Sequence, residues 1–370
     1  MQLPNRFLLS CRVRLRLMRP CIAVLALAGL AAPAALAETL ALVPGSDLVG
    51  TLMTVRAAYE DTLTDIARRT GLGYEDMRDA NPGVDPWLPG KDAEVLLPTR
   101  YVLPAGIRQG ILVNIAEYRL YYFTRVGDRP VVATFPVSIG RMDWATPIGV
   151  HRILSKQAQP TWYPPESIRA EHAADGDILP KAIPPGPKNP LGDYAMRLSS
   201  AGYLIHGTNR SVGIGMQVTH GCIRMYPEDI EWLFPKVPVG TPVQIVNQPY
   251  KFGWAPDGLY LEVHPHLEGD AGAGDHGMTD VTALYVRATA ERPARVDWDL
   301  VEKVYREKLG IPVRVFRPVA TADLRVLIGS VGTTTSSSPN RWAPFRKAGW
   351  AVSGRIICGW AIPRDWAQLR

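Results

Sequence analysis

One 19-residue window, residues 206–224, constrains the fold of this chain more than any other feature. It begins with His206-Gly207, continues through a Gly-rich connection, and ends in Thr219-His220-Gly221-Cys222-Ile223-Arg224. A thiol is a good nucleophile only as the thiolate, so a catalytic cysteine needs an imidazole or another positive field nearby. If residues 219–224 are extended, His220, Cys222 and Arg224 project to one side, because strand side chains alternate. His206 then comes from an adjacent strand, so the window predicts a β-rich domain built around a cysteine site.

The neighbours of Cys222 suit acyl chemistry. Gly221 carries no side chain, so the backbone N–H groups of Gly221 and Cys222 can approach a developing oxyanion. The planar guanidinium of Arg224 fits a substrate carboxylate, and we expect Arg224 and Thr219 to contact the substrate. Two other interpretations stay open at this point. Cys222 could be a small buried apolar residue, or it could bind zinc together with His206 and His220, although their spacing is unlike the usual zinc motifs.

Residues 105–250 are rich in short β-type segments and poor in long helical periodicity. Expected strands lie at 111–115, 119–123, 131–139, 149–154, 195–198 and 243–246, and residues 116–118 close a hairpin between the first two. The proline-rich stretches 160–165 and 183–190 predict surface loops at one end of the domain, with a cleft between them. The pattern predicts a mostly β domain, either a β-sandwich or a partly open barrel.

A small α+β unit is expected over residues 54–98, within a module spanning 38–104. Asp61 stands where a helix N-cap belongs, an apolar stripe follows, and Gly71 stops the helix. A second helix fits Tyr74–Ala80, since Asn81-Pro82-Gly83 breaks it, and residues 95–97 form a closing strand.

The two ends of the chain differ from its middle. Residues 1–37 combine five arginines, an apolar run at 21–32 and Ala35-Leu36-Ala37, which is the layout of a cleaved signal peptide. The alternative, an uncleaved anchor, is disfavoured because the run is shorter than the ~20 residues that span a bilayer. At the other end, residues 251–319 predict an extension with one amphipathic helix at 297–309, stopped by Gly310, and residues 320–370 form a tail for which no argument selects order or disorder.

The predicted export and the net charge of the mature chain argue against two classes of protein, those held together by many disulfides and those that bind nucleic acid. Cleavage after residue 37 removes Cys11 and Cys21 and leaves Cys222 and Cys358, too few for a disulfide framework. The net charge of +6 falls to +1 without the five arginines of the leader. This near-neutral mature chain is unlike a nucleic-acid-binding protein. No later segment is long enough to span a membrane, so we expect a periplasmic or cell-envelope protein.

Residues 111–246 resemble the L,D-transpeptidase catalytic domain, the YkuD family, and especially its ErfK/YbiS-type members. The resemblance rests on His206 and the 219–224 segment, and on Phe135-Pro136-Val137-Ser138-Ile139-Gly140, Thr146-Pro147-Ile148-Gly149, Leu179-Pro180 and Asn189-Pro190-Leu191-Gly192. The small α+β unit resembles a LysM module, which binds the N-acetylglucosamine of cell-wall glycans. Its matching pieces are Asp61-Thr62-Leu63, Ile66-Ala67, Asn81-Pro82, Pro89-Gly90 and Val95-Leu96-Leu97-Pro98.

The resemblance to the transpeptidases implies a reaction and a role for each residue. Cys222 would be the nucleophile and His206 the proton donor and acceptor, with His220 activating or positioning the thiol and the Gly207 carbonyl orienting His206. The substrate would be a peptidoglycan stem peptide: Cys222 attacks the diaminopimelate–D-Ala bond, expels D-Ala and forms a thioester. No metal or organic cofactor is implied.

The acceptor stays open in the sequence. An amine of a second stem would give a 3→3 cross-link, the lysine of an outer-membrane lipoprotein would give wall anchoring, and water would give carboxypeptidase-type hydrolysis. A different class of function, a wall-binding protein with an inactive catalytic domain, is disfavoured because His206, His220, Cys222 and Arg224 are all present.

Overall fold

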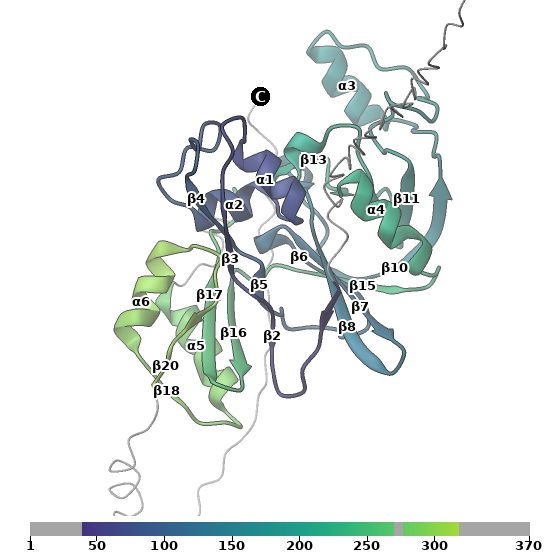
Figure 1. The fold of residues 1–370 in the computed structure, drawn as a ribbon. Helices are drawn as coiled ribbons and strands as arrows, with labels where there is room; N and C mark the ends of the chain where they lie inside the picture. The colour runs from purple at the N-terminus through teal and green to yellow at the C-terminus, as the bar shows by residue number, and fades with distance from the viewer. Residues whose placement is uncertain (1–38, 270–276, 318–370) are drawn as a thin grey trace, which may run out of the picture. The chain divides into compact units, whose positions relative to one another are not determined.

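A computed structural model describes residues 39–269 and 277–317 of the chain (Figure 1). The predicted signal peptide, the predicted tail and Cys358 lie outside the described residues. Within the described part, no helix combines the length and the apolar character needed to cross a bilayer.

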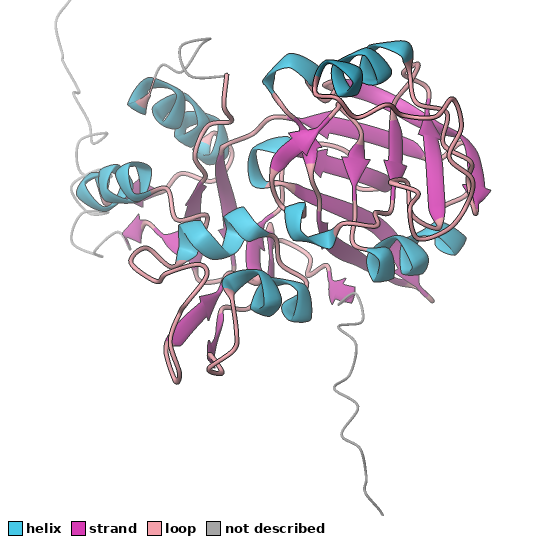
Figure 2. Ribbon diagram, turned by 90° about the horizontal axis from the view of Figure 1, so that it is seen from above, coloured by secondary structure: helices cyan, strands magenta, loops and turns pink. Residues whose placement is uncertain are grey.

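The main element is a curled nine-stranded sheet (Figure 2), which confirms the predicted mostly β architecture. From edge to edge its strands are β1 (Thr39–Ala41), β8 (Arg129–Pro136), β7 (Arg119–Val126), β6 (Gly110–Asn114), β15 (Pro242–Val246), β10 (Gly149–Ala158), β11 (Tyr194–Leu198), β12 (Leu204–His206) and β14 (Ile223–Arg224). All the expected strands are found, and the segment at 131–139 divides into β8 and β9 (Ile139–Gly140). β9 pairs in parallel with β13 (Gln217–Thr219) beside the sheet.

The predicted hairpin forms between β6 and β7. The 3-10 turn Ile115–Glu117 ends at Tyr118, whose left-handed backbone (φ 50°) turns the chain back into β7. The buried side of the sheet forms one large core that includes Ile111, Phe135 and Ile205. β1 pairs with β8, so the first described residues belong to this sheet and not to the N-terminal module where the sequence placed them.

Two short helices within residues 105–250 are not predicted by the sequence pattern. α3 (Glu166–Ala174) lies between the two proline-rich loops, and α4 (Pro227–Leu233) follows β14. α3 buries only Ile168, so it shows no apolar periodicity that the sequence could have revealed. Asn189 holds the surrounding loops, since its amide donates to the Pro160, Ile183 and Pro184 carbonyls.

The N-terminal module (residues 53–97) contains β3 (Met53–Arg56), α1 (Leu63–Thr70), α2 (Tyr74–Ala80) and β4 (Glu94–Leu97). β3 pairs with β4, and Leu63, Ile66 and Met77 fill a small separate core. The expected α2 is confirmed, and Gly71 ends α1 in a left-handed conformation. The predicted N-cap Asp61 is wrong: Thr62 caps α1 and shares a capping box with Asp65, whereas Asp61 pairs with Arg69. Nearby, β2 (Leu48–Gly50) pairs with β5 (Arg100–Val102).

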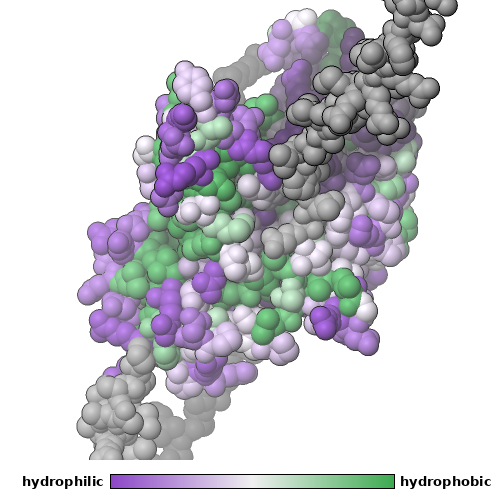
Figure 3. All heavy atoms as spheres, viewed as in Figure 1, coloured by the Kyte–Doolittle hydropathy of each residue, from purple (hydrophilic) through white to green (hydrophobic). Residues whose placement is uncertain are grey.

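The C-terminal extension packs around a third core. Its elements are β16 (Tyr250–Ala255), β17 (Gly258–Val263), α5 (Met278–Thr289), β18 (Arg295–Val296), α6 (Trp298–Glu307), β19 (Val313–Arg314) and β20 (Phe316–Arg317). The one predicted helix corresponds to α6, which ends at a left-handed Lys308 before the expected stop, Gly310. α5 is a second helix that the sequence did not reveal, because Val281 is its only fully buried residue. Hydrophilic side chains cover α6 in the space-filling view (Figure 3).

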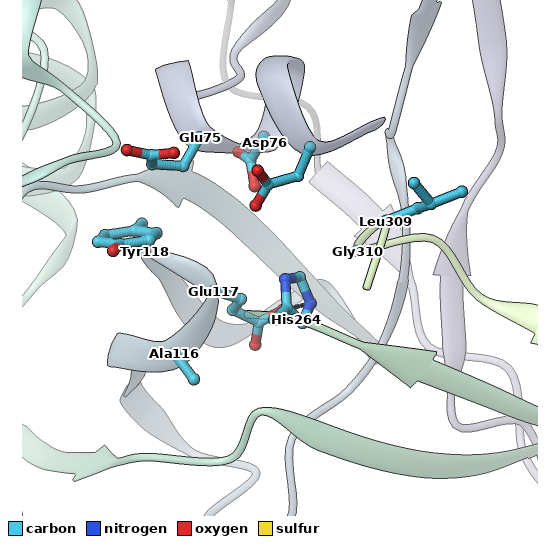
Figure 4. Close-up of a pocket in the computed structure, with 9 residues that line it drawn as sticks. Glu75, Asp76, Ala116, Glu117, Tyr118, His264, Leu309 and Gly310 are labelled. Atoms are coloured by element: carbon cyan, nitrogen blue, oxygen red, sulfur yellow. Dashed lines mark ion pairs between the residues drawn. The ribbon is translucent and has the colours of Figure 1, made fainter. Parts of the chain in front are cut away.

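Buried charged side chains lie where the main β domain, the C-terminal extension and the N-terminal module come together. The Lys251 ammonium lies between the carboxylates of Glu117 and Glu262, 2.7 Å from the latter, and all three side chains are almost fully buried. His264 completes the group 2.7 Å from Glu262, and beside it Glu117 and His264 line a small pocket with Glu75 and Asp76 of the module (Figure 4). Glu117, Glu262 and His264 are close enough to hold a cation, and Lys251 supplies that positive charge.

Candidate active site

His206 ends β12, which runs parallel to β14 with Ile205 opposite Ile223 and His206 opposite Arg224. The structure therefore brings His206 and the Cys222 segment together on adjacent strands, as the sequence predicts. The imidazole is buried, with 5% of His206 exposed.

A backbone carbonyl orients the imidazole. Nδ1 of His206 lies 2.6 Å from the Gly207 oxygen, so Nδ1 carries the proton and Nε2 keeps its lone pair. Burial and, next, the charge of Arg224 lower the pKa of His206 to about 3. A side chain at residue 207 would meet Ile230 at 3.0 Å, which leaves the backbone oxygen as the orienting group. His206 is thus a neutral base in the free protein.

The segment at 219–224 is not one strand. β13 ends at Thr219, β14 begins at Ile223, and Gly221 between them has a φ of 92°. The predicted alternation is therefore wrong, because the left-handed Gly221 breaks the period of two. A Cβ at this position would lie 2.6 Å from the Tyr203 ring and 3.2 Å from the Trp144 carbonyl, so only glycine fits. We call residues 219–223 the catalytic turn.

Cys222 is a half-buried free thiol in this turn. Burial raises its pKa, whereas the Leu204 N–H and the charge of Arg224 act in the opposite direction. The Sγ of Cys222 lies 3.8 Å from the Gly202 carbonyl oxygen, and with His206 neutral the resting site holds an uncharged thiol and an uncharged imidazole. Among the described residues, the N–H groups of Gly221 and Cys222 donate no hydrogen bond to another group, so both are free for an oxyanion.

Arg224 supplies positive charge beside the thiol. It is half-buried, and no carboxylate of the described residues pairs with it. Its Nε is buried without a hydrogen-bond partner. Burial lowers the pKa of Arg224, a negative charge on the Cys222 thiolate would raise it, and the charge of Arg210 lowers it to a smaller extent. A buried cation without a counter-ion favours a ligand that carries a carboxylate.

Two threonines hold the catalytic turn from inside. Thr219 is 1% exposed, and its hydroxyl donates to the Cys222 carbonyl at 2.6 Å. The Thr146 hydroxyl donates to the Gly221 carbonyl at 3.0 Å and accepts from the Gly140 N–H at 2.9 Å. Both hydroxyls are thus engaged with the backbone of the site. Thr146 was not singled out as a site residue, although it lies in the Thr146-Pro147-Ile148-Gly149 motif.

His220 points to α3. Its Nε2 lies 3.1 Å from the Glu171 carboxylate, and its ring packs edge-on against Trp144 with centroids 5.2 Å apart. Glu171 also accepts from the Arg141 guanidinium. No sequence pattern indicates Glu171, an acidic residue on a mostly exposed helix. Among the described residues, the ligand atoms of His206, His220 and Cys222 do not gather at one point, so the zinc interpretation is not supported.

Comparison with known proteins finds a matching family model and solved structures with local similarity. Residues 108–245 match the model of YkuD, the L,D-transpeptidase catalytic domain. The structure of the catalytic domain of an E. faecium L,D-transpeptidase aligns with a TM-score of 0.28 and 22% identity, over 38% of this chain and 99% of that one.

Two relatives match over most of their length. A protein of Salmonella typhimurium named "Probable L,D-transpeptidase ErfK/SrfK" is 39% identical over 276 residues, 73% of this chain and 88% of the relative. An Escherichia coli protein named "Probable L,D-transpeptidase YbiS" is 38% identical over 276 residues, 73% of this chain and 89% of the relative. The chain therefore belongs to the L,D-transpeptidase family that carries the YkuD catalytic domain.

Proposed function

We propose that this enzyme is a peptidoglycan L,D-transpeptidase with Cys222 as its nucleophile. The observation that carries the proposal is that the strand ending at the buried His206 pairs with the strand that follows Cys222, opposite Arg224, whose half-buried guanidinium has no carboxylate partner among the described residues. Family membership supplies the reaction class, and the geometry supports a role for each residue.

The first half-reaction transfers the acyl group of a donor stem to the enzyme. Nε2 of His206 accepts the thiol proton while the sulfur of Cys222 bonds to the carbonyl between diaminopimelate and D-Ala. The Gly221 and Cys222 N–H groups stabilise the oxyanion. The C–N bond then breaks, His206 returns the proton to the amine of the leaving D-Ala, and a thioester remains.

Arg224 and Thr219 take different roles in this proposal. Arg224 binds a carboxylate of the donor, since its charge has no protein partner in the described structure. Thr219 is a positioning residue, because its buried hydroxyl is bonded to the Cys222 carbonyl. His220 is held by Glu171 and borders the turn, so it positions the segment that carries the thiol.

An amine resolves the thioester in the second half-reaction. A diaminopimelate amine of a second stem gives a 3→3 cross-link, and the lysine amine of a lipoprotein gives wall anchoring. We place the enzyme in the periplasm, exported by the cleaved leader. A disaccharide-tetrapeptide donor, followed for D-Ala release with and without an amine acceptor, tests this function. We expect release together with a joined product, whereas a trimmed tripeptide alone would indicate hydrolysis.

The N-terminal module is proposed to bind glycan strands. Its surface carries Tyr59, Trp87 and Leu88, exposed to 76%, 55% and 76%. The loops that carry them meet at the start of α1, where the Leu63 N–H donates to the Pro86 carbonyl. Exposed aromatic and apolar side chains on adjoining loops support a binding role for this surface. Sedimentation of the full chain with sacculi, compared with the Trp87→Ala variant, tests the proposal: equal sedimentation would argue against it.

A further inference from the structure

We propose that the N-terminal module positions the loop that joins the two halves of the active site. This loop, residues 207–216, begins directly after His206 and leads through β13 into the catalytic turn. This loop connects the proposed base, His206, to the segment of the proposed nucleophile, Cys222. A shift of the loop therefore changes the position of the thiol relative to the imidazole. The inference rests on the proposed roles of His206 and Cys222.

The first turn of α2 contacts the middle of the loop. The Tyr74 N–H donates to the Ile214 carbonyl at 3.1 Å, and the Glu75 N–H donates to the Gly215 carbonyl at 3.3 Å. The two backbones touch here: a Cβ on Gly73 would lie 2.7 Å from the Gly215 Cα, and a Cβ on Gly215 would lie 2.4 Å from the Gly73 Cα. α1, α2 and β13 accordingly lie close together (Figure 1). Glycine on both sides permits this approach.

Buried groups fix α2 in this place. The Asp76 carboxylate accepts from the Gly73 N–H at 2.9 Å and pairs with Arg119 of β7, whose side chain is 1% exposed. The Arg119 guanidinium lies over the Tyr101 ring, 4.4 Å from its centroid. A buried ion pair of this kind is costly to break, so the first turn of α2 is held firmly against the sheet.

The other side of the loop is also held. The Ser138 hydroxyl donates to the Gly213 carbonyl at 2.7 Å, and the Ile139 N–H donates to the Met216 carbonyl at 3.1 Å. The loop is therefore clamped between α2 and the β8–β9 connection. Ser138 also pairs with Arg224 through both backbone groups, which links this clamp to the substrate-binding strand. The module therefore contributes to catalysis beyond any affinity for glycan.

Two substitutions at Tyr74 distinguish the effect of the hydrogen bond from its N–H to the Ile214 carbonyl from the effect of its side chain. Tyr74 is the first residue of α2, where proline is well tolerated, and the extended Gly73 before it suits a following proline. Tyr74→Pro removes the N–H that reaches Ile214, and Tyr74→Ala keeps it while removing the same ring. The substrate is a sugar-free tetrapeptide stem, so glycan affinity does not enter the rate. We expect kcat of the full chain to be about five-fold lower for Tyr74→Pro than for Tyr74→Ala, with KM within two-fold, as for loss of one hydrogen bond.

A second pair of variants, Gly73→Ala and Gly83→Ala, changes the module without deleting a donor. Gly73→Ala pushes on Gly215, and we expect about a ten-fold loss of kcat, because small misplacements of reacting groups are costly. Gly83→Ala, in the same module, has no atom within 4 Å of its new Cβ and should stay near the wild-type rate. A loosened turn exposes Cys222, so iodoacetamide should alkylate the Gly73→Ala protein about three-fold faster at neutral pH.

The outcomes separate this inference from the proposed function. If folded Tyr74→Pro and Gly73→Ala proteins match their controls in kcat and in alkylation while the wild type releases D-Ala, the module does not position the loop and the function stands. If the wild type releases no D-Ala, the proposed function fails first. Should Gly73→Ala not fold, the Tyr74 pair decides alone.

Discussion

Nδ1 of His206 lies 2.6 Å from the carbonyl oxygen of Gly207. The backbone thus does for this imidazole what a carboxylate or hydroxyl side chain does in many catalytic triads: it fixes the tautomer and leaves Nε2 with its lone pair. Ile230 leaves little room for a side chain at residue 207, so the carbonyl is the orienting group. Burial and the charge of Arg224 lower the pKa of His206, and the only opposing contributions come from hydrogen bonds to the Gly207 and Leu191 backbones, so His206 stays neutral.

The Cys222 thiol of the free enzyme should lose its proton only at alkaline pH. Burial raises the pKa of Cys222 above its usual value of 9.0, and His206, with a pKa of about 3, adds no positive charge near neutral pH. The rate of alkylation by iodoacetamide should therefore increase with pH through an apparent pKa above 9, with no step between pH 6 and 7. A pH–rate profile with a plateau from pH 7 would instead show a preformed thiolate–imidazolium pair.

Gly221→Ala should lower activity strongly through the geometry of the turn. The new Cβ meets Tyr203 at 2.6 Å on a backbone with a φ of 92°. Displacement of the Cys222 sulfur by about 1 Å is expected to cost about 100-fold in kcat/KM. Gly240→Ala is the matched control, since Gly240 has a φ of 91° and nothing within 4 Å. Equal losses of activity in the two variants would mean that backbone strain alone, and not the contact with Tyr203, explains the effect.

Arg224→Gln should weaken recognition of the donor carboxylate. Loss of a charge-assisted hydrogen bond corresponds to about 1.5–3 kcal/mol, or about 10- to 100-fold in kcat/KM. Comparing donors with a free and an amidated D-Ala carboxyl group identifies the group that is bound. The wild type should prefer the free acid and Arg224→Gln should lose that preference; a preference that persists would assign Arg224 to another group of the substrate.

Asp229 should make the fold less stable as pH rises. It lies in the first turn of α4 with its Oδ2 buried and unpaired among the described residues, and burial raises its pKa from 3.8 to about 8. The folded chain thus holds a proton that the unfolded chain releases, so stability is lost as pH rises from about 4 to about 8. Asp229→Asn should stabilise the fold by about 1–2 kcal/mol at pH 8 and by less at pH 5.

The stabilisation by Asp229→Asn is measured as the difference in melting temperature from the wild type between about pH 4 and about pH 8. Glu231→Gln, on the exposed side of α4, is the control. A difference between Asp229→Asn and the wild type that does not change with pH would show that the Asp229 carboxyl does not titrate in this way.

Elements that depend on residues close in sequence could be predicted from the sequence, whereas those that depend on contacts between distant residues could not. α2 was predicted correctly because Gly73 and Asn81-Pro82 lie beside it in the chain, and the β6–β7 hairpin because its apolar strands are contiguous. The prediction of a straight strand through residues 219–224 is wrong because Gly221 is left-handed. Tyr203 and Trp144, which exclude a side chain at this position, are distant in sequence. Glu171 could not be found either, since its link to His220 exists only after α3 folds over the turn.

The most direct test of the account is the intact mass of the mature protein after incubation with a disaccharide-tetrapeptide. We expect an adduct equal to the donor minus D-Ala, absent in Cys222→Ala and formed about 100-fold or more slowly in His206→Ala, as for loss of a general base. Cys222→Ala should keep the fold and any sacculus binding of the wild type. Release of D-Ala by Cys222→Ala, or a wild type that forms no adduct and releases no D-Ala, would contradict the assignment of Cys222 as the nucleophile.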